Sequence, residues 1–248
     1  MRQIYAYETE NDRLAIQPVT EVLIEKAQEY QDYLANYFAL KEPALFVVWT
    51  KADFANLVFG NHDLPAYNNG TRIVMCPDKK EWEILFLKAF KAYELPLQLS
   101  RYYQSLPDYQ MLQIFLHEIT HDSDLFGSEY GDTRENLWFE EGMCEYLSYR
   151  YLLKEEELSE LRALLQQQVD FFSPIFGRFD VEKFSEETYQ KGNLAYLHTF
   201  YVHAFLTVSD LVDRFGSVEQ VFACYKNWWE DSSNVSLYDW LMKEEKTC

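Results

Sequence analysis

Hydrophobic residues recur at helical spacing through most of this chain, and residues 18–40 give the first clear example. Pro18 suits the first position of a helix, where its missing N–H costs nothing. Apolar side chains then fall three or four positions apart, as one face of a helix requires: Val22, Leu23, Ala27, Tyr30, Leu34 and Phe38. The pattern predicts a long helix that packs as the first layer of the fold.

Two short runs rich in β-branched and aromatic residues predict strands instead. The run ALFVVWT at 44–50 is typical of a buried strand, and a short helical segment is expected after it. A second strand is predicted at 71–76, directly after the turn signal Asn-Asn-Gly. Two or more strands should therefore precede the helical part of the chain.

Beyond residue 76 the pattern is helical. Irregular helical turns are expected over 81–106 with a break at Pro96, and a helix over 107–126 begins at Pro107 and Asp108. Further helices are predicted at 136–151, 188–216, 217–231 and 236–246, while the charged run 154–161 is expected to be a solvated face or a junction. The predicted fold class is α+β and mostly helical.

The plausible division of the chain is into two lobes. Residues 1–127 would form an N-terminal lobe with a small mixed sheet, and residues 128–248 a helical C-terminal lobe, with Gly127 and Gly131 near the junction. A hydrophobic content of 48% supplies a sizeable core, and the scarcity of Gly (8) and Pro (7) favours long helices over a many-stranded sandwich.

Net charge narrows the range of partners. A formal charge of -19 disfavours nucleic acid and anionic membrane surfaces, so neutral, cationic or small partners are expected. The sequence contains no signal-like run and no apolar stretch of about 20 residues, from which a cytoplasmic location is expected. Its four scattered cysteines indicate neither a disulfide framework nor a cysteine-type zinc site. The oligomeric state is left open.

The stretch QIFLHEITHDSDLF carries the candidate chemistry. Residues four apart project from one face of a helix, so His117 and His121 can bind one ion, and neutral imidazole suits Zn²⁺. Glu118 could then take a proton from bound water. Chance produces this pattern in about one such sequence in 100, so the five letters alone also permit an ordinary polar helix face.

A second stretch, LWFEEGMCEYLSYRY, supplies the carboxylates that a catalytic zinc site requires. Glu141 and Glu145 are four apart and share a helix face. Glu141 is the candidate third ligand, which leaves a fourth position for water. Glu145 is the candidate hydrogen-bond partner of a ligand histidine, and Glu140 is expected to be an exposed carboxylate.

HEITH, followed at this distance by WFEEGMCEY, resembles the gluzincin zinc peptidases, the clan that contains thermolysin and aminopeptidase N. The closest likeness is to the broad, mostly bacterial group related to aminopeptidase N. The resemblance implies a thermolysin-like zincin catalytic domain, with His117, His121 and Glu141 as ligands and Glu118 as the base. It also implies zinc as cofactor and a peptide or protein as substrate.

Two further segments extend the resemblance. ETYQKGNLAY is similar to the Tyr-x-Lys-Gly segment in which the family places a tyrosine that stabilises the tetrahedral intermediate, so Tyr189 is the matching residue. His198 and His203 compete with it for that role. PAYNNGTRIVMCP resembles the edge strand beside the zinc, but it lacks the Gly-x-Met-Glu-Asn motif of the aminopeptidases.

Two functions are therefore weighed from the sequence. The first is a zinc metallopeptidase, with exopeptidase and endopeptidase activity both open because the amine-binding motif is missing. The alternative is a non-catalytic binding or regulatory module that has the gluzincin fold and may retain zinc. The presence of Glu118 beside a complete set of ligands favours the enzyme.

Overall fold

The computed structural model describes the chain except residues 38–45, 60–63, 125, 127–135, 232–233 and 244–248. The expected junction at Gly127 and Gly131 therefore lies outside the described residues. The strands are β1 (Arg2–Ala6), β2 (Phe46–Thr50), β3 (Ala66–Asn68) and β4 (Arg72–Met75). The α-helices are α1 (Glu10–Leu34), α2 (Ala52–Phe54), α3 (Lys79–Phe90), α4 (Leu97–Gln104), α5 (Gln110–Thr120), α6 (Leu137–Leu152), α7 (Glu155–Phe176), α8 (Glu186–Gln190), α9 (Leu194–Phe215), α10 (Val218–Glu230) and α11 (Leu237–Lys243). A π-helical turn, η1 (Ala55–Phe59), and a 3-10 turn, η2 (Val181–Lys183), complete the described elements.

The four strands form one mixed sheet in the order β1-β2-β4-β3. β1, β2 and β4 are parallel, and β3 pairs antiparallel with β4 at one edge. Gly70 has a φ of 77° in the turn between β3 and β4, a backbone conformation that favours glycine. The structure thus confirms an α+β fold that is mostly helical and has a small mixed sheet in its N-terminal part.

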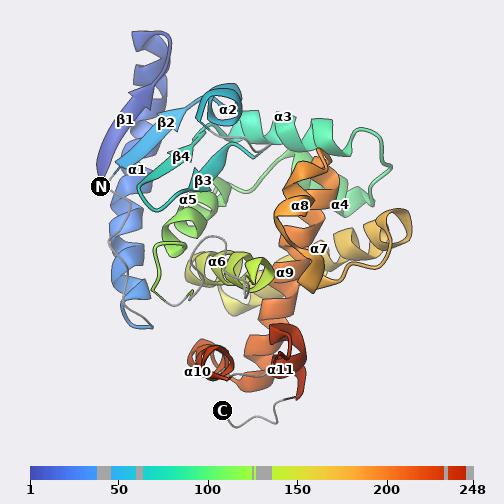
Figure 1. Ribbon diagram of the computed structural model, residues 1–248. Helices are drawn as coiled ribbons and strands as arrows, with labels where there is room; N and C mark the ends of the chain where they lie inside the picture. Colours follow the sequence, from blue (N-terminus) through green and yellow to red (C-terminus); the bar gives the residue numbers. More distant parts are fainter. Residues whose placement is uncertain (38–45, 60–63, 125, 127–135, 232–233, 244–248) are drawn as a thin grey trace.

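Helices cover the sheet and then pack on one another (Figure 1). α5 packs against the edge strand β3 and against α1, and α6 packs against the other side of α5. The sheet contributes Trp49 to the interface with α5, where its ring centroid lies 5.0 Å from that of Phe115. α9 crosses α6 and leads to α10 and α11 at the far end of the molecule (Figure 1).

Gly142 allows α6 and α9 to approach closely. A Cβ added at this position would lie 2.6 Å from the carbonyl oxygen of Ala204 and 2.7 Å from Cγ2 of Val208. A side chain there would have to push the two helices apart. The absence of a side chain at Gly142 therefore lets α9 pack close to α6, and this contact brings α9 to the candidate site.

Several predicted boundaries were wrong. The first helix begins at Glu10 and holds Pro18 in its interior, because Thr9 caps it by accepting a hydrogen bond from the Asp12 N–H. Val22, assigned to the buried face, is 55% exposed. The helix expected over 107–126 is shorter and begins only at Gln110.

Other elements were missed or merged. The sequence pattern predicted neither β1 nor α7, which begins within the charged run 154–161. The helix expected over 188–216 is two helices, α8 and α9, separated at Gly192, where φ is 63°. Cys224 is disulfide-bonded, whereas Cys76 and Cys144 are free and buried.

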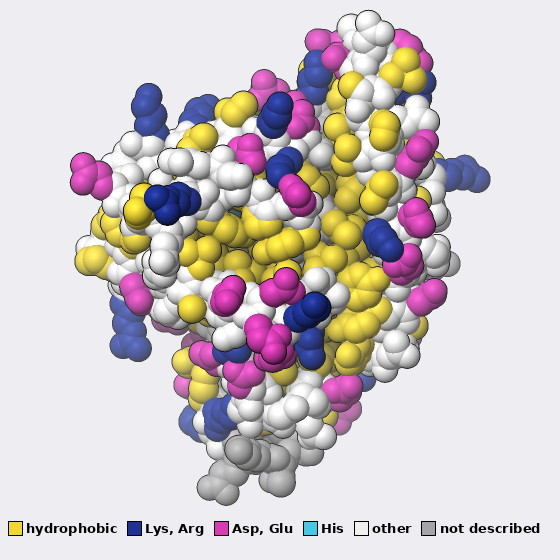
Figure 2. All heavy atoms as spheres, turned by 180° about the vertical axis from the view of Figure 1, so that it is seen from behind, with side chains coloured by type: hydrophobic (Ala, Val, Ile, Leu, Met, Phe, Trp, Pro, Cys, Tyr) yellow, Lys and Arg dark blue, Asp and Glu magenta, His cyan; other side chains and the backbone are white. Residues whose placement is uncertain are grey.

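The face opposite that of Figure 1 has a broad band of hydrophobic side chains, and no histidine is visible on it (Figure 2). Exposed apolar residues of α1 include Leu14 and Val19, which are 51% and 41% exposed. Within the described part of the chain, no helix combines the length and apolar character needed to cross a membrane.

Candidate metal centre

Residues from α5 and α6 form the centre of the candidate site. α5 provides His117 and Glu118, and His121 follows its last residue with helical φ and ψ of -61° and -21°. The apolar face of α5 anchors it in the core through Phe115 and Leu116, which are fully buried. The four-residue spacing of the two histidines therefore survives although the helix ends at Thr120.

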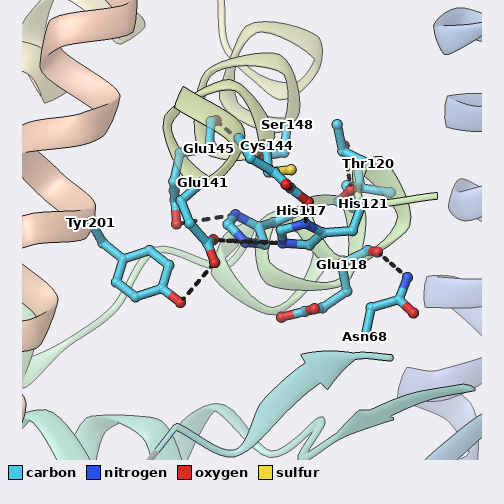
Figure 3. Close-up of polar contacts among 12 residues, drawn as sticks. Asn68, His117, Glu118, Thr120, His121, Glu141, Cys144, Glu145, Ser148 and Tyr201 are labelled. Atoms are coloured by element: carbon cyan, nitrogen blue, oxygen red, sulfur yellow. Dashed lines mark hydrogen bonds and ion pairs between the residues drawn. The ribbon is translucent and has the colours of Figure 1, made fainter. Parts of the chain in front are cut away.

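Three candidate ligand atoms form a triangle at the centre of the site (Figure 3). Nε2 of His117 lies 3.2 Å from Nε2 of His121, and Oε2 of Glu141 lies 3.1 Å and 3.6 Å from these two nitrogens. Ligand atoms about 2.0–2.1 Å from a tetrahedral Zn²⁺ would be separated by about 3.3 Å. The three sequence-predicted ligands are thus brought to separations that fit one zinc ion.

Burial strengthens the case for a cation at this point. Glu141 is only 5% exposed, and its Oε2 has no hydrogen-bond donor. Burial alone would raise the pKa of its carboxyl, but His121 and His117 hold that pKa well below its usual range. A buried anionic oxygen facing two imidazole nitrogens is a donor set that suits Zn²⁺.

Two further carboxylates approach the outer nitrogens of the histidines. Oε1 of Glu145 lies 3.4 Å from Nδ1 of His117, and its Oε2 accepts a 2.8 Å hydrogen bond from Gln113. Oε1 of Glu140 lies 2.8 Å from Nδ1 of His121. The expectation of an exposed Glu140 was wrong, since its side chain is 24% exposed and in contact with the second histidine.

The carboxylate of Glu118 lies beneath the two histidines and has no marked contact with the triangle atoms (Figure 3). It is 7% exposed, and burial raises the pKa of its carboxyl to about 7, although His117 and His121 act in the opposite direction. It also lines a cavity together with His117. Its position suits a group that exchanges protons with a molecule in that cavity.

Two tyrosines contact the far oxygen of Glu141. Tyr189, on α8, donates a 3.1 Å hydrogen bond to Oε1, and its hydroxyl lies 2.6 Å from that of Tyr201 on α9. Tyr201 is 3.4 Å from the same carboxylate oxygen. Sequence reasoning missed Tyr201, and no motif could have found it, because it reaches the site through the close contact of α9 with α6.

Of these two tyrosines, Tyr201 lines the cavity. Its ring centroid lies 6.1 Å from that of His117. The two hydroxyls form one hydrogen-bonded unit with Glu141, in which Tyr201 is the member that faces the open side.

The competing histidines of α9 are not in this cluster. His198 accepts a 3.0 Å hydrogen bond from Gln168, and its ring lies against Phe86 and Phe90. His203 lies against Phe179. Neither histidine has a described contact with the triangle atoms. Tyr189 and Tyr201 are therefore better placed than either histidine to donate a hydrogen bond beside the triangle.

Asn68, on the edge strand β3, was also missed. Its side-chain amide donates to the backbone carbonyl of Glu118 at 2.7 Å (Figure 3). The same amide donates to Oδ1 of Asp122 at 2.8 Å, while its own Oδ1 accepts from the Gly70 N–H. The edge strand is therefore fixed directly to the helix that carries Glu118.

Cys144 adds a possible fourth donor. Ligand atoms of His117, His121 and Cys144 all lie within 4.8 Å of one another. The separations of 3.1 to 3.6 Å among the triangle atoms fit a common ion more closely, so Glu141 is the better third ligand. The four cysteines form no CxxC pair, but Cys144 is a single thiol one helical turn from Glu141.

Comparison with known proteins adds nothing to this geometry. No protein-family model matches the chain, and neither a curated protein nor a solved structure does.

Proposed function

We propose that this protein is a zinc-dependent metallopeptidase of the gluzincin type with a thermolysin-like catalytic domain. The observation that carries the proposal is the triangle of His117 Nε2, His121 Nε2 and Glu141 Oε2, with separations of 3.1 to 3.6 Å. Two imidazoles and one carboxylate leave a fourth position for water, which is the donor set of catalytic rather than structural zinc sites. The two ligand helices belong to the proposed N-terminal lobe (1–127) and C-terminal lobe (128–248).

Zinc in this position would lower the pKa of water and polarise a peptide carbonyl. Glu118 accepts the proton of the attacking water and passes it to the leaving amine, as its place at the cavity permits. Tyr201, whose hydroxyl lies 2.6 Å from that of Tyr189, would turn its hydrogen from that contact toward the developing oxyanion and donate to it. Glu140 orients His121 through a 2.8 Å hydrogen bond to its Nδ1. Glu145, 3.4 Å from Nδ1 of His117, is placed to orient that ring when the metal is bound.

The substrate we propose is an extended peptide. β3 is the edge of the sheet and is bonded to the helix of Glu118, so a peptide backbone could pair with it beside the site. Glu118, Glu140, Glu141 and Glu145 all belong to the site, and the chain carries a net charge of -19. Neutral or cationic peptides should therefore bind better than acidic ones.

Metal analysis and peptide digestion together test the proposal. Purified protein should hold about one zinc per chain, and it should cut members of a mixed peptide library unless a chelator is added. Glu118→Gln should retain the zinc and lose hydrolysis. Full activity of that variant would contradict the assigned base, while absence of zinc from the wild-type protein would contradict the whole site.

The second candidate is a non-catalytic module with a closed metal site, and the position of Cys144 is what favours it. A thiolate bound as fourth ligand would leave no position for water. The absorption spectrum of the Co²⁺-substituted protein distinguishes the open catalytic site from the closed site, because a bound thiolate gives Co²⁺ an intense charge-transfer band in the near ultraviolet. Our proposal expects no such band and the same spectrum in Cys144→Ser; a band that this substitution removes would favour the closed site.

A further inference from the structure

A cavity of about 80 Å³ extends from the candidate metal centre into the protein. One face of α9 lines its length with residues three and four apart: His198, Tyr201, Val202 and Phe205. Tyr201 marks the end beside His117. His198 marks the other end, where its ring centroid lies 4.8 Å from that of Phe86 and 5.6 Å from that of Tyr103.

The hydrogen bonds behind His198 determine which ring nitrogen carries its proton. Thr199 donates its hydroxyl hydrogen to the Ala195 carbonyl, so its oxygen must accept from the amide nitrogen of Gln168. That same nitrogen lies 3.0 Å from Nδ1 of His198, which is therefore the acceptor. Burial lowers the pKa of His198 to about 3, so the ring is neutral and its proton is on Nε2.

Several other polar groups along the cavity have hydrogen-bond partners. The Tyr103 hydroxyl donates to Oε1 of Gln168, and the indole N–H of Trp82 donates to the Cys76 carbonyl. Tyr102 and Gln110 are bonded to each other. Among the described residues none bonds to Nε2 of His198, so the His198 end of the cavity offers one free donor.

Size and wall chemistry restrict what the cavity can hold. A cavity of about 150 Å³ accommodates benzene, so about half that volume suits a side chain of four or five atoms better than an aromatic ring. The ring of His198 lies against the uncharged aromatic rings of Phe86 and Tyr103, whereas the carboxylates of Glu118 and Glu145 line the cavity elsewhere. A charged group beside His198 would therefore be buried without a partner. An amide would leave its N–H groups without acceptors there.

We propose that this cavity receives one side chain of the peptide and selects an uncharged, unbranched side chain with a hydrogen-bond acceptor, for which methionine is the natural fit. A thioether packs well against aromatic rings and accepts one weak hydrogen bond, which Nε2 of His198 supplies. The inference rests on the proposed function in taking a peptide as the ligand.

The test measures binding separately from cleavage. Peptides that differ at a single position, occupied by Met, norleucine, Gln, Phe, Glu or Lys, are titrated into zinc-loaded Glu118→Gln, and the wild-type protein is assayed with the same series. Norleucine matches methionine in shape but lacks the acceptor. We expect Met to bind about threefold tighter than norleucine, as a weak hydrogen bond allows, and Glu and Lys to bind at least about a hundredfold more weakly.

Two histidine variants provide the matched comparison. His198→Phe in the Glu118→Gln background should abolish the preference for Met over norleucine, whereas His203→Phe, on the same helix but outside the cavity, should preserve it. Should His198→Phe fail to fold, NMR of the Glu118→Gln protein replaces it, because the Nε2 proton resonance of His198 should shift with the Met peptide and much less with norleucine.

The outcomes separate the two proposals. Equal binding of Met and norleucine, or tight binding of the charged peptides, would overturn the assigned pocket even if the wild-type protein cleaves peptides. The expected order of binding without any cleavage by wild-type protein would support the pocket and count against the metallopeptidase.

Discussion

Glu140 and Glu141 are adjacent in sequence yet contact different atoms of the histidines. Glu141 faces the two Nε2 atoms, whereas Oε1 of Glu140 lies 2.8 Å from Nδ1 of His121. Sequence spacing predicted the first carboxylate, because a third ligand must follow the two histidines on another helix. It could not predict the second, since neighbouring glutamates differ in role only through the side chains that tertiary packing brings to them.

Removing the Glu140 carboxylate should weaken the metal site without abolishing it. Glu140→Ala takes away the group that orients His121, and losses of about 10- to 100-fold in metal affinity are typical of such partners. Competition with a chromophoric chelator measures the zinc affinity. Glu156→Ala, an exposed glutamate of α7, is the control and should leave it unchanged. Equal affinities of the two variants would show that Glu140 is only a surface carboxylate.

His198 should make the protein sensitive to acid. Burial lowers its pKa from 6.5 to about 3, so the folded chain keeps the ring neutral while the unfolded chain protonates it. No charged group is among its described ring or hydrogen-bond partners, which are Phe86 and Phe90 on α3, Tyr103 on α4 and Gln168 on α7. Above pH 6.5 the ring is neutral in both states, so His198 does not make the free energy of unfolding depend on pH. Below pH 6.5 the unfolded chain takes up a proton that the folded chain does not, so the free energy of unfolding decreases as the pH falls.

Urea denaturation at pH 7.0 and 5.5 measures this effect. Between these values the wild-type free energy of unfolding should fall more than that of His198→Gln, by at most about 1.4 kcal/mol per pH unit. Comparing the two proteins cancels the contributions of the groups that titrate alike in both. An identical fall in the two proteins would mean that His198 titrates normally when folded.

At the scale of elements, the side chain of Asn68 links the short strand β3 to α5. Asn68 bonds the Glu118 carbonyl and Asp122, and it also closes the hairpin through the Gly70 N–H. Asn69 stabilises the same hairpin through the Thr71 and Arg72 N–H groups, but it has no described bond to α5. Substitution of Asn69 therefore tests the hairpin alone, whereas substitution of Asn68 tests both the hairpin and its bond to α5.

Asn68→Ala should therefore lower both stability and peptidase activity, whereas Asn69→Ala should lower stability alone. Loss of buried hydrogen bonds predicts a decrease of about 1–3 kcal/mol in the free energy of unfolding for Asn68→Ala. Misplacement of β3 should reduce kcat/KM by about tenfold or more. Urea titrations and cleavage of one peptide measure the two effects. Equal losses of kcat/KM in both variants would contradict a specific role for Asn68.

The elements that the sequence predicted are those with a strong internal pattern. The helix of HEITH shows clear periodicity, and the strands of 44–50 and 71–76 are rich in β-branched residues. β1 gives no such signal because its five residues are largely exposed and are held by pairing with β2. Tyr201 and His198 gained their positions from the packing of α9, which no local pattern encodes.

At the scale of the whole molecule, the candidate ligands come from two parts of the chain. His117 and His121 end the N-terminal part, and Glu141 belongs to the helical part that follows residues 127–135, which the structure does not describe. A bound ion would connect α5 to α6 at the centre of the fold. Metal binding should therefore stabilise the entire protein rather than one local segment.

Zinc should raise the unfolding temperature, and the increase should grow with the logarithm of the free zinc concentration once this exceeds Kd. A ligand that binds only the folded state adds about 2.7 kcal/mol to the free energy of unfolding at a concentration 100 times its Kd. Thermal melts followed by circular dichroism, with added zinc and with chelator, should differ by several degrees in the wild-type protein. His121→Ala, which lacks one ligand, should melt at nearly the same temperature in both conditions. A zinc-dependent shift of equal size in this variant would place the stabilising metal elsewhere in the chain.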